Sequence, residues 1–362
     1  MGQDIKNLVD YLTSPTLYFI EFTLAIFLVL RFRAFFTKTS VIAVFFAVAT
    51  AFMVFAFGDP NFRRIITKPD NVPIVILLAT VIYFSWLSLR RAYDNDERVK
   101  RGEPTMEASM GKQRVFVWPD LVYSELIFLV LFTAVLIVWS IEITAPIEEP
   151  AASARTPNPS KAPWYFLGLQ ELLVYFDPWI AGVLLPGFII VGLCAIPYID
   201  VNPKGNGYYT FEERKFAVTF FWVGFLLFWV SFVILGTFLR GPNWSFFGPF
   251  EYWDLHKLEP MVNVDLATYF WTGLLDMARP VNPLIRELPG FVSLFVFFVV
   301  VPKALEKPLM RKLFNGDRTH LIRYHVMMHL LLWFALIPIK MLLRWTVNLK
   351  YIVGIPEWFF NI

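Results

Sequence analysis

The stretch SKAPWYFLGLQELLVYFD, from Ser160 to Asp177, lies between two apolar runs that are each long enough to cross a membrane. Pro163 stands where a helix tolerates proline, because the first turn leaves backbone N–H groups without a helical acceptor. Beyond it, apolar side chains recur at helical spacing, and Glu171 is among the few polar residues. The stretch predicts a short amphipathic helix along the membrane surface, with Trp164 and Tyr165 at the headgroup level. On composition alone, an interfacial anchor is its simplest interpretation.

The composition predicts an integral membrane protein. Of 362 residues, 57% are hydrophobic and only 17% are charged, and the mean hydropathy is +0.57. A soluble domain of this length would be far more polar. The net charge of +3 is too small to indicate a nucleic-acid partner, so membrane lipid is the expected surrounding. The single cysteine, Cys194, excludes thiolate iron–sulfur ligation within this chain and is expected to be a small core residue.

Eight apolar runs are long enough to cross a hydrocarbon layer of about 30 Å. They are uninterrupted and lack the alternation of barrel strands, so each predicts a helix, and the fold class is all-α and polytopic. Pro186 and Pro197 are expected to kink the fifth run, and Pro302 to end or bend the seventh. The runs are residues 16–36, 39–57, 72–90, 121–142, 178–199, 216–238, 289–305 and 321–346.

Charge and composition divide the chain and orient it. More than half of the 32 Lys and Arg residues lie in the loops that face inward if both termini are outside, so both termini are placed on the outer, electropositive side. A polar loop between Leu89 and Trp118 is the clearest internal boundary. We expect an N-terminal three-helix extension (1–105), a central domain (106–238), an aromatic-rich outer loop (239–288) and two C-terminal spans (289–362).

Four segments of the central domain carry a family resemblance. They are VFVWPDLVYSELIFLV, WSIEITAPIEEP, KAPWYFLGLQELL and GLCAIPYIDVNP, and they occur in this order between residues 115 and 203. Together they resemble subunit IV of the plastoquinol to plastocyanin oxidoreductase and the C-terminal half of cytochrome b in respiratory cytochrome bc-type quinol oxidoreductases. In that family an Asp-Leu-Leu-Tyr-like segment opens a span on the inner side, and a Pro-Glu-Trp-Tyr motif precedes a surface helix on the outer side. Asp120 and Trp164 stand at the corresponding positions.

The resemblance implies a membrane subunit of a cytochrome bc-type quinol:cytochrome c (or similar acceptor) oxidoreductase in a bacterial inner membrane. It implies that Pro163, Trp164, Tyr165 and Phe166 line an outer site where quinol is oxidised. Haem b would belong to a cytochrome b-type partner chain, and further partners would be a Rieske or other iron–sulfur protein and a c-type cytochrome. This chain would then be a subunit of an enzyme that carries quinone or quinol but no metal of its own.

The chain departs from the family at the acid of the outer motif. The family's Glu is assigned the proton that quinol releases, and here Pro163 occupies its place. Glu171, about two turns further along the predicted surface helix, is the favoured catalytic substitute, and Glu148 and Glu149 are alternatives in the same loop. A solvated helix acid with no catalytic part explains Glu171 equally well.

Asp120 is the corresponding candidate on the inner side. At this position the family uses an Asp at the inner quinone site, where reduction of quinone takes up protons, so Asp120 is expected to be both catalytic and quinone-binding. A helix N-terminus also favours an acid for electrostatic reasons alone. Both interpretations remain open.

Two further features of the chain are candidates for a functional site. His325 and His329 lie one turn apart on the last span, so a single haem or quinone contact competes with a structural cluster near the inner surface. The chain ends in IPEWFFNI, where Glu357 and Trp358 imitate the outer motif more closely than Ala162 to Tyr165 do. No surface helix or span follows this copy, so we interpret it as interfacial.

The aromatic residues of the outer loop suit either an interfacial skirt or a docking surface for an outer redox partner. Two other functions compete with the quinol oxidoreductase. One is a structural assembly subunit without a quinone site. The other is a secondary transporter, which the missing inverted repeat and the missing pair of broken helices with mid-membrane charges disfavour.

Overall fold

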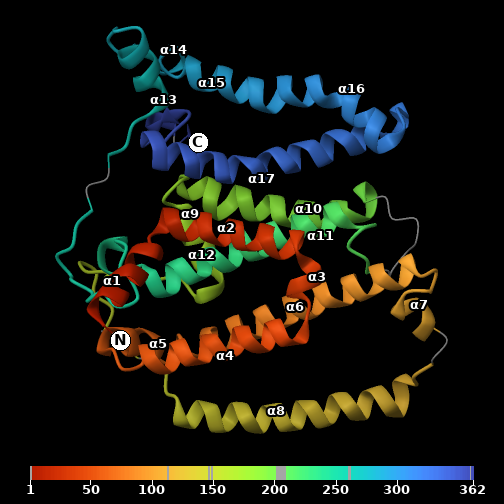
Figure 1. The fold of residues 1–362 in the computed structure, drawn as a ribbon. Helices are drawn as coiled ribbons and strands as arrows, with labels where there is room; N and C mark the ends of the chain where they lie inside the picture. The colour runs from red at the N-terminus through yellow and green to blue at the C-terminus, as the bar shows by residue number, and fades with distance from the viewer. Residues whose placement is uncertain are drawn as a thin grey trace. The chain divides into compact units, whose positions relative to one another are not determined.

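The computed structural model describes residues 2–111, 114–145, 147, 150–200, 209–259, 262–358 and 360–362. Nearly all regular structure in these residues is helical, and the two strands, β1 (Gly354–Ile355) and β2 (Phe360–Asn361), form one small antiparallel pair. The predicted all-α class is confirmed (Figure 1).

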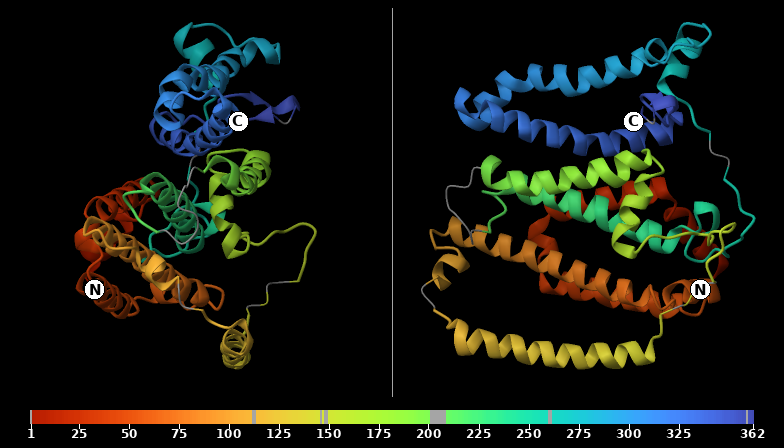
Figure 2. Two further views of the ribbon diagram at one scale, coloured as in Figure 1. Left: turned by 90° about the vertical axis from the view of Figure 1, so that its right-hand side faces the viewer. Right: turned by 180° about the vertical axis from the view of Figure 1, so that it is seen from behind.

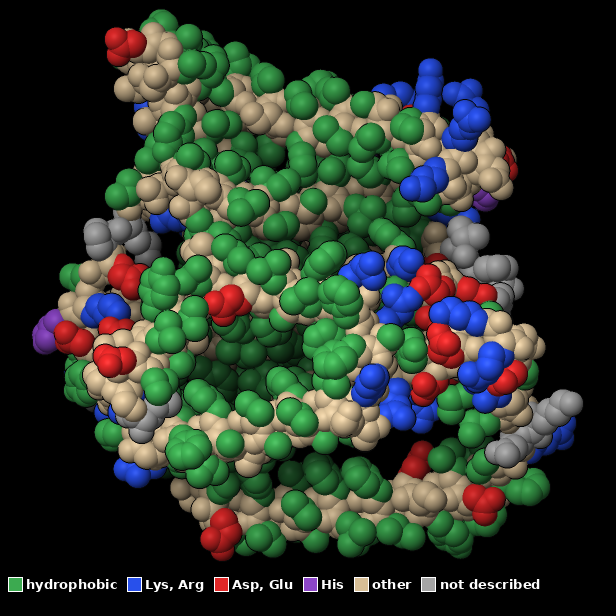
Figure 3. Space-filling view, in the orientation of Figure 1, with side chains coloured by type: hydrophobic (Ala, Val, Ile, Leu, Met, Phe, Trp, Pro, Cys, Tyr) green, Lys and Arg blue, Asp and Glu red, His purple; other side chains and the backbone are tan. Residues whose placement is uncertain are grey.

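Seven helical stretches of the described chain are long and apolar enough to cross a membrane. An eighth arises if α1 (Gln3–Leu12) and α2 (Pro15–Arg31), which meet at a bend of 77°, count as one span. The predicted eight runs therefore correspond to helices. The seven are Thr39–Ala56, Val72–Lys100, Val117–Glu142, Ile180–Ile199, Lys215–Leu239, Leu288–Phe314 and Arg318–Val347. Charged side chains gather mainly at the ends of these helices (Figure 3).

The chain forms two compact units, of residues 1–165 with 204–258 and of residues 166–203 with 259–362. The described helices of the first unit, besides α1 and α2, are α3 (Arg33–Phe36), α4 (Thr39–Ala56), α5 (Pro60–Ile66), α6 (Val72–Lys100), α7 (Met106–Met110), η1 (Val117–Leu121), α8 (Val122–Glu142), α11 (Lys215–Trp222), η4 (Val223–Val230), α12 (Ser231–Ile234), η5 (Leu235–Leu239) and η6 (Pro242–Trp244).

The first unit joins its N-terminal helices to the beginning of the outer loop. Phe250 packs with Ala56 and Phe62 in one hydrophobic cluster. Asp10 of α1 accepts a hydrogen bond from the backbone N–H of Phe250, at 2.9 Å. Asp59 caps α5 by accepting from the backbone N–H groups of Asn61 and Phe62. Phe250 is thus a core residue of its own chain, and neither the skirt nor the docking interpretation applies to it.

Among the described stretches that are long and apolar enough to span a membrane, α8 packs least within the first unit. None of its residues is buried. The views in Figure 2 show α8 standing apart from α4 and α6. Its apolar side chains are therefore available to lipid or to another chain rather than packed in the first unit.

The described elements of the second unit are η2 (Trp164–Phe166), which begins in the first unit, α9 (Leu167–Leu172), η3 (Ile180–Leu184), α10 (Leu185–Ile199), α13 (Leu266–Thr268), η7 (Tyr269–Leu274), α14 (Pro283–Arg286), α15 (Leu288–Phe295), η8 (Val296–Val300), α16 (Val301–Phe314), η9 (Arg318–His320), α17 (Leu321–Val347) and η10 (Pro356–Trp358), with β1 and β2. Helix α17 packs against both α10 and α16 (Figure 1). Trp333 of α17 lies between Phe188 and Phe298, with ring centroids 4.9 and 4.8 Å away.

Prolines in two spans follow a wider, π-helical turn. The turn η3 precedes Pro186, and η8 precedes Pro302. A widened turn is one way in which a helix accommodates a residue that lacks an N–H. The helix continues past Pro302 to Phe314, so this proline does not end the seventh span. The hydroxyl of Tyr324 donates to the carbonyl of Pro302 at 2.7 Å.

The expectation that Cys194 is a core residue was wrong. Its side chain is exposed on α10. A long apolar helix in a membrane protein need not bury each of its small residues, because lipid is as apolar as the protein core.

Candidate functional site

The segment that leads into the aromatic motif is anchored to the loop that follows the sixth span. The side-chain amide of Asn158 donates to Oδ1 of Asn243 at 2.9 Å, and Oδ1 of Asn158 accepts from the backbone N–H of Asn243 at 2.6 Å. Lys161 Nζ donates to the carbonyl of Thr237 at 2.8 Å and lies 5.0 Å from the centroid of the Trp253 ring. These contacts lie within the first unit. They fix both ends of the short segment, residues 158–161, that leads into the motif.

Trp164 continues a row of aromatic rings along one face of the sixth span. Its ring centroid lies 6.0 Å from that of Trp229, and Trp229 stacks on Phe225 at 5.4 Å. Phe225 in turn stacks on Phe221 at 5.3 Å. At the other end, Tyr165 meets Trp164 edge-on at 5.6 Å and is 47% exposed. The row is a wall of π faces, which suits a flat, apolar ring.

Sequence reasoning missed the three members of this row that lie on the sixth span. Phe221, Phe225 and Trp229 follow one another at every fourth residue, and such residues share a helix face. That spacing was a usable signal. It did not indicate which other segment the face would meet, and the contact with Trp164 came only from the structure.

A helix follows Pro163, as predicted. Its first and last residues differ from the prediction, and so does the face that it buries. A 3-10 turn over Trp164–Phe166 leads into α9, which ends at Leu172. Phe166 is 50% exposed. Glu171 has no exposed surface at all, whereas one of its two interpretations from the sequence was a solvated helix acid.

The interpretation of Glu171 as a solvated helix acid is therefore wrong. The carboxyl group of Glu171 is shielded from bulk water. The alternatives Glu148 and Glu149 lie outside the described residues. Among the described acids of this loop and helix, Glu171 remains the candidate.

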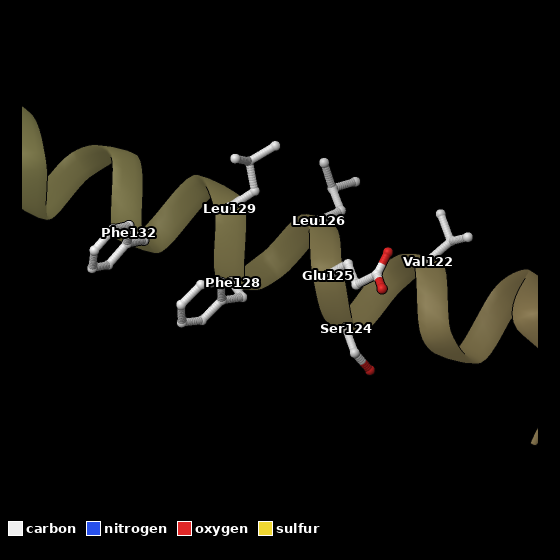
Figure 4. Close-up of a pocket in the computed structure, with 7 residues that line it drawn as sticks. All are labelled: Val122, Ser124, Glu125, Leu126, Phe128, Leu129 and Phe132. Carbon is white, nitrogen blue, oxygen red and sulfur yellow. The ribbon is translucent and has the colours of Figure 1, made fainter. Parts of the chain in front are cut away.

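Asp120 lies at the beginning of the span that contains α8, whereas Trp164 follows the other end of this helix in the sequence. It belongs to η1, and the 21 residues of α8 that follow span roughly 31 Å, about the thickness of a hydrocarbon layer. The structure therefore does not bring Asp120 and Trp164 together, as expected for two sites on opposite membrane faces. Further along α8, Glu125 lies with six neighbouring side chains around an open groove on this single helix, and these side chains extend to different sides of the ribbon (Figure 4). The groove is lined by Val122, Ser124, Glu125, Leu126, Phe128, Leu129 and Phe132.

The histidines of the last span do not fit a haem held by a pair of histidines. His325 and His329 lie on the same helix, and Nδ1 of His329 is 2.8 Å from the carbonyl oxygen of His325. His325 Nε2 lies 3.6 Å from Glu306, which also pairs with Lys303 at 2.6 Å. No group of three or more metal-ligating side chains occurs in the part of the chain that the structure describes.

In the copy of the motif at the C-terminal end, the glutamate forms an ion pair. Arg286 donates to both carboxylate oxygens of Glu357, at 3.4 and 3.2 Å. The hydrogen bond from Arg286 lowers the pKa of Glu357, so this carboxyl group stays ionised and accepts protons poorly. Glu357 lies in η10, between the two short strands, and no surface helix follows it in the described residues. These contacts support its interpretation as an interfacial segment.

The membrane-spanning helices and the anchored aromatic motif define a polytopic membrane protein with a candidate site built around the loop that precedes α9. Residues 150–246 match the family model described as cytochrome b (C-terminal)/b6/petD. This segment is therefore a cytochrome b C-terminal/b6/petD domain, as the motifs predicted, and residues 1–149 and 247–362 lie outside the match. The match covers well under half of the chain, and for this segment it supports a membrane domain of the kind found in cytochrome bc-type oxidoreductase complexes. No solved structure matches the chain.

Proposed function

We propose that this chain lines the outer quinol-oxidising site of a cytochrome bc-type quinol oxidoreductase with Pro163, Trp164, Tyr165 and Phe166. The observation that carries the proposal is that the family match covers this motif, whose aromatic rings also extend a half-exposed π wall. The anchors at Asn158 and Lys161 hold the motif without covering it.

The reaction at this site is the oxidation of quinol to quinone with release of two electrons and two protons. The electrons pass to haem b and an iron–sulfur centre on partner chains, with a c-type cytochrome or a similar carrier as the final acceptor. Redox chemistry belongs to those groups, and this chain's residues bind and orient the ring and receive a proton. Glu171 is the proposed acceptor of one proton, in place of the family acid that Pro163 replaces.

The proposal requires a haem-bearing neighbour. When the chain is purified from native membranes through an affinity tag in mild detergent, we expect it to bring a second membrane protein that shows the absorbance of b-type haem. The preparation should reduce a soluble c-type cytochrome with a short-chain quinol as donor. A photo-reactive amino acid at position 164 should label the haem-bearing chain or a quinone analogue. Purification of this chain alone from active membranes, or labelling of lipid only, would show that the proposed site does not exist.

Asp120 is the proposed proton-linked residue of the inner quinone site. We expect Asp120→Asn to weaken the binding of an inner-site quinone analogue by about ten-fold, equivalent to about 1.4 kcal/mol, which is within the range for the net contribution of one hydrogen bond. Equilibrium binding to the purified assembly measures this effect. Unchanged binding and turnover, with reduced thermal stability, would leave Asp120 only its favourable interaction with the helix N-terminus.

A structural assembly subunit is the alternative function. It also accounts for a partner-rich membrane chain, and α8, with no buried residue, suits it. The two functions differ at the aromatic wall, because only the oxidoreductase requires Trp164 and Tyr165 to contact a quinone.

A further inference from the structure

The end of helix α9 is held by a lysine from the C-terminal segment of the same unit. Lys350 Nζ donates to the backbone carbonyls of Leu173 and Val174, at 3.0 and 3.1 Å. These residues directly follow Leu172, where a helix leaves its last carbonyl groups without a helical partner. An ammonium group in this position satisfies those carbonyls and interacts favourably with the negative end of the helix.

A second, fully buried lysine supports the first. Lys340 of α17 has no exposed surface, and its Nζ donates to the backbone carbonyl of Lys350. The same Nζ lies 5.6 Å from the centroid of the Phe176 ring, within the range of a cation–π contact. A charge within a membrane-spanning helix is costly and is kept where it has a specific partner. Lys340 thus touches both the lysine that caps α9 and the chain that follows α9.

Two aromatic contacts complete the attachment. The hydroxyl of Tyr351 donates to Oδ1 of Asp177 at 3.3 Å. The ring of Tyr175, which is almost fully buried, meets Trp345 edge-on with centroids 6.2 Å apart. The chain from the end of α9 to Asp177 is therefore held by several side chains of the C-terminal segment rather than by one.

The C-terminal segment is itself firmly supported within the second unit. The backbone N–H of Lys350 donates to the carbonyl of Val264 at 2.9 Å. At Gly290 a Cβ atom would collide with the carbonyl of Ile352, so α15 approaches the segment as closely as a glycine allows. The C-terminal segment is thus fixed by Val264 and α15 and not by α9. Because its position does not depend on α9, it can hold α9 in place.

The electrostatics of Lys350 fit a capping role at neutral pH. Burial is the main reason that the pKa of Lys350 falls from 10.5 to about 8, followed by the nearby charge of Arg344, while Asp177 opposes the fall. The side chain still carries its charge at pH 7. It therefore donates as an ammonium group to the carbonyls at the end of α9.

We propose that Lys350, supported by Lys340, is a positioning residue for α9 and so for the quinol site that includes Phe166 and Glu171. This inference rests on the proposed function. Both lysines lie outside residues 150–246. The C-terminal segment of this chain therefore contributes, from outside the matched domain, contacts that hold helix α9 of that domain.

The test compares Lys350→Met and Lys350→Arg with Lys307→Met in the intact assembly. Lys307 is an exposed lysine of α16 in the same unit, so its variant controls for the loss of a positive charge. Amide hydrogen exchange of residues 166–177, followed by mass spectrometry, reports the position of α9 without reference to activity. Turnover with a short-chain quinol, measured as a function of pH, reports the site.

For Lys350→Met we expect amide exchange in this segment to rise about ten-fold, kcat/KM for quinol to fall about ten-fold and the pH profile to shift. Lys350→Arg should restore all three, and Lys307→Met should change none. Unchanged exchange in Lys350→Met would overturn the positioning role and leave the proposed quinol site untouched. Faster exchange with unchanged turnover and pH profile would instead overturn the link between α9 and the site, and with it the role proposed for Glu171.

Discussion

Glutamine in place of Glu171 is expected to slow quinol oxidation about a hundred-fold, with little change in the affinity for quinol. The substitution keeps the size of the side chain and removes its ability to take up a proton, and general base catalysis typically contributes 10² to 10⁴ in rate. Because Glu171 has no exposed surface, water cannot readily substitute for it. Steady-state turnover of the purified assembly between pH 5 and 9 measures the effect, and the dependence of the rate on pH should change as well.

Glu357 provides a matched control for this experiment. It is the acid of the chain's Pro-Glu-Trp sequence at residues 356–358, it is exposed, and it is already paired with Arg286. We expect Glu357→Gln to leave turnover and its pH profile as they are. Wild-type rates in Glu171→Gln, in a preparation with normal subunit content, would remove Glu171 from the reaction and direct attention to Glu148 and Glu149.

Trp164→Ala is expected to weaken binding of a quinone analogue at the outer site by about thirty-fold, equivalent to about 2 kcal/mol. The substitution removes the ring that links Tyr165 to Trp229, so it separates Tyr165 from the rest of the aromatic wall. Trp164→Phe should recover most of the affinity, because an aromatic face remains. Equilibrium binding of the analogue to the intact assembly, with haem content as a check on assembly, measures both variants.

The tryptophan of the C-terminal copy separates a specific effect from a general one. Trp358 is 57% exposed and lies next to Glu357 in η10. If Trp358→Ala weakened analogue binding as strongly as Trp164→Ala, both residues would act only through interfacial packing. If neither substitution weakened analogue binding, a structural assembly role would explain the chain better than a quinol site.

Much of the fold was predictable because lipid imposes a simple condition on the chain. A run of about 20 apolar residues must pair its backbone groups internally, so runs such as 39–57 and 121–142 indicated helices with little ambiguity. The motif around Trp164 was also visible, because its neighbours in sequence carry the resemblance that the family match confirmed.

The environment of single side chains was not predictable in the same way. A membrane protein can turn an apolar face to lipid, so hydrophobicity does not distinguish the buried face of a helix from the exposed one. Cys194 was expected in the core and is exposed, and Glu171, for which a solvated position was one of two interpretations, is buried. The carbonyl contacts of Lys350 depend on the path of the backbone after α9, which has no signature in the sequence.

The isolation of α8 has a consequence for any study of Asp120. None of the residues of α8 is buried, so side-chain packing within the first unit does little to fix the rotation of this helix about its own axis. We therefore expect the direction in which Asp120 and Glu125 point to depend on what surrounds the helix in the assembled membrane complex. Reconstituting this polypeptide by itself would then leave the orientation of these two carboxylates undefined.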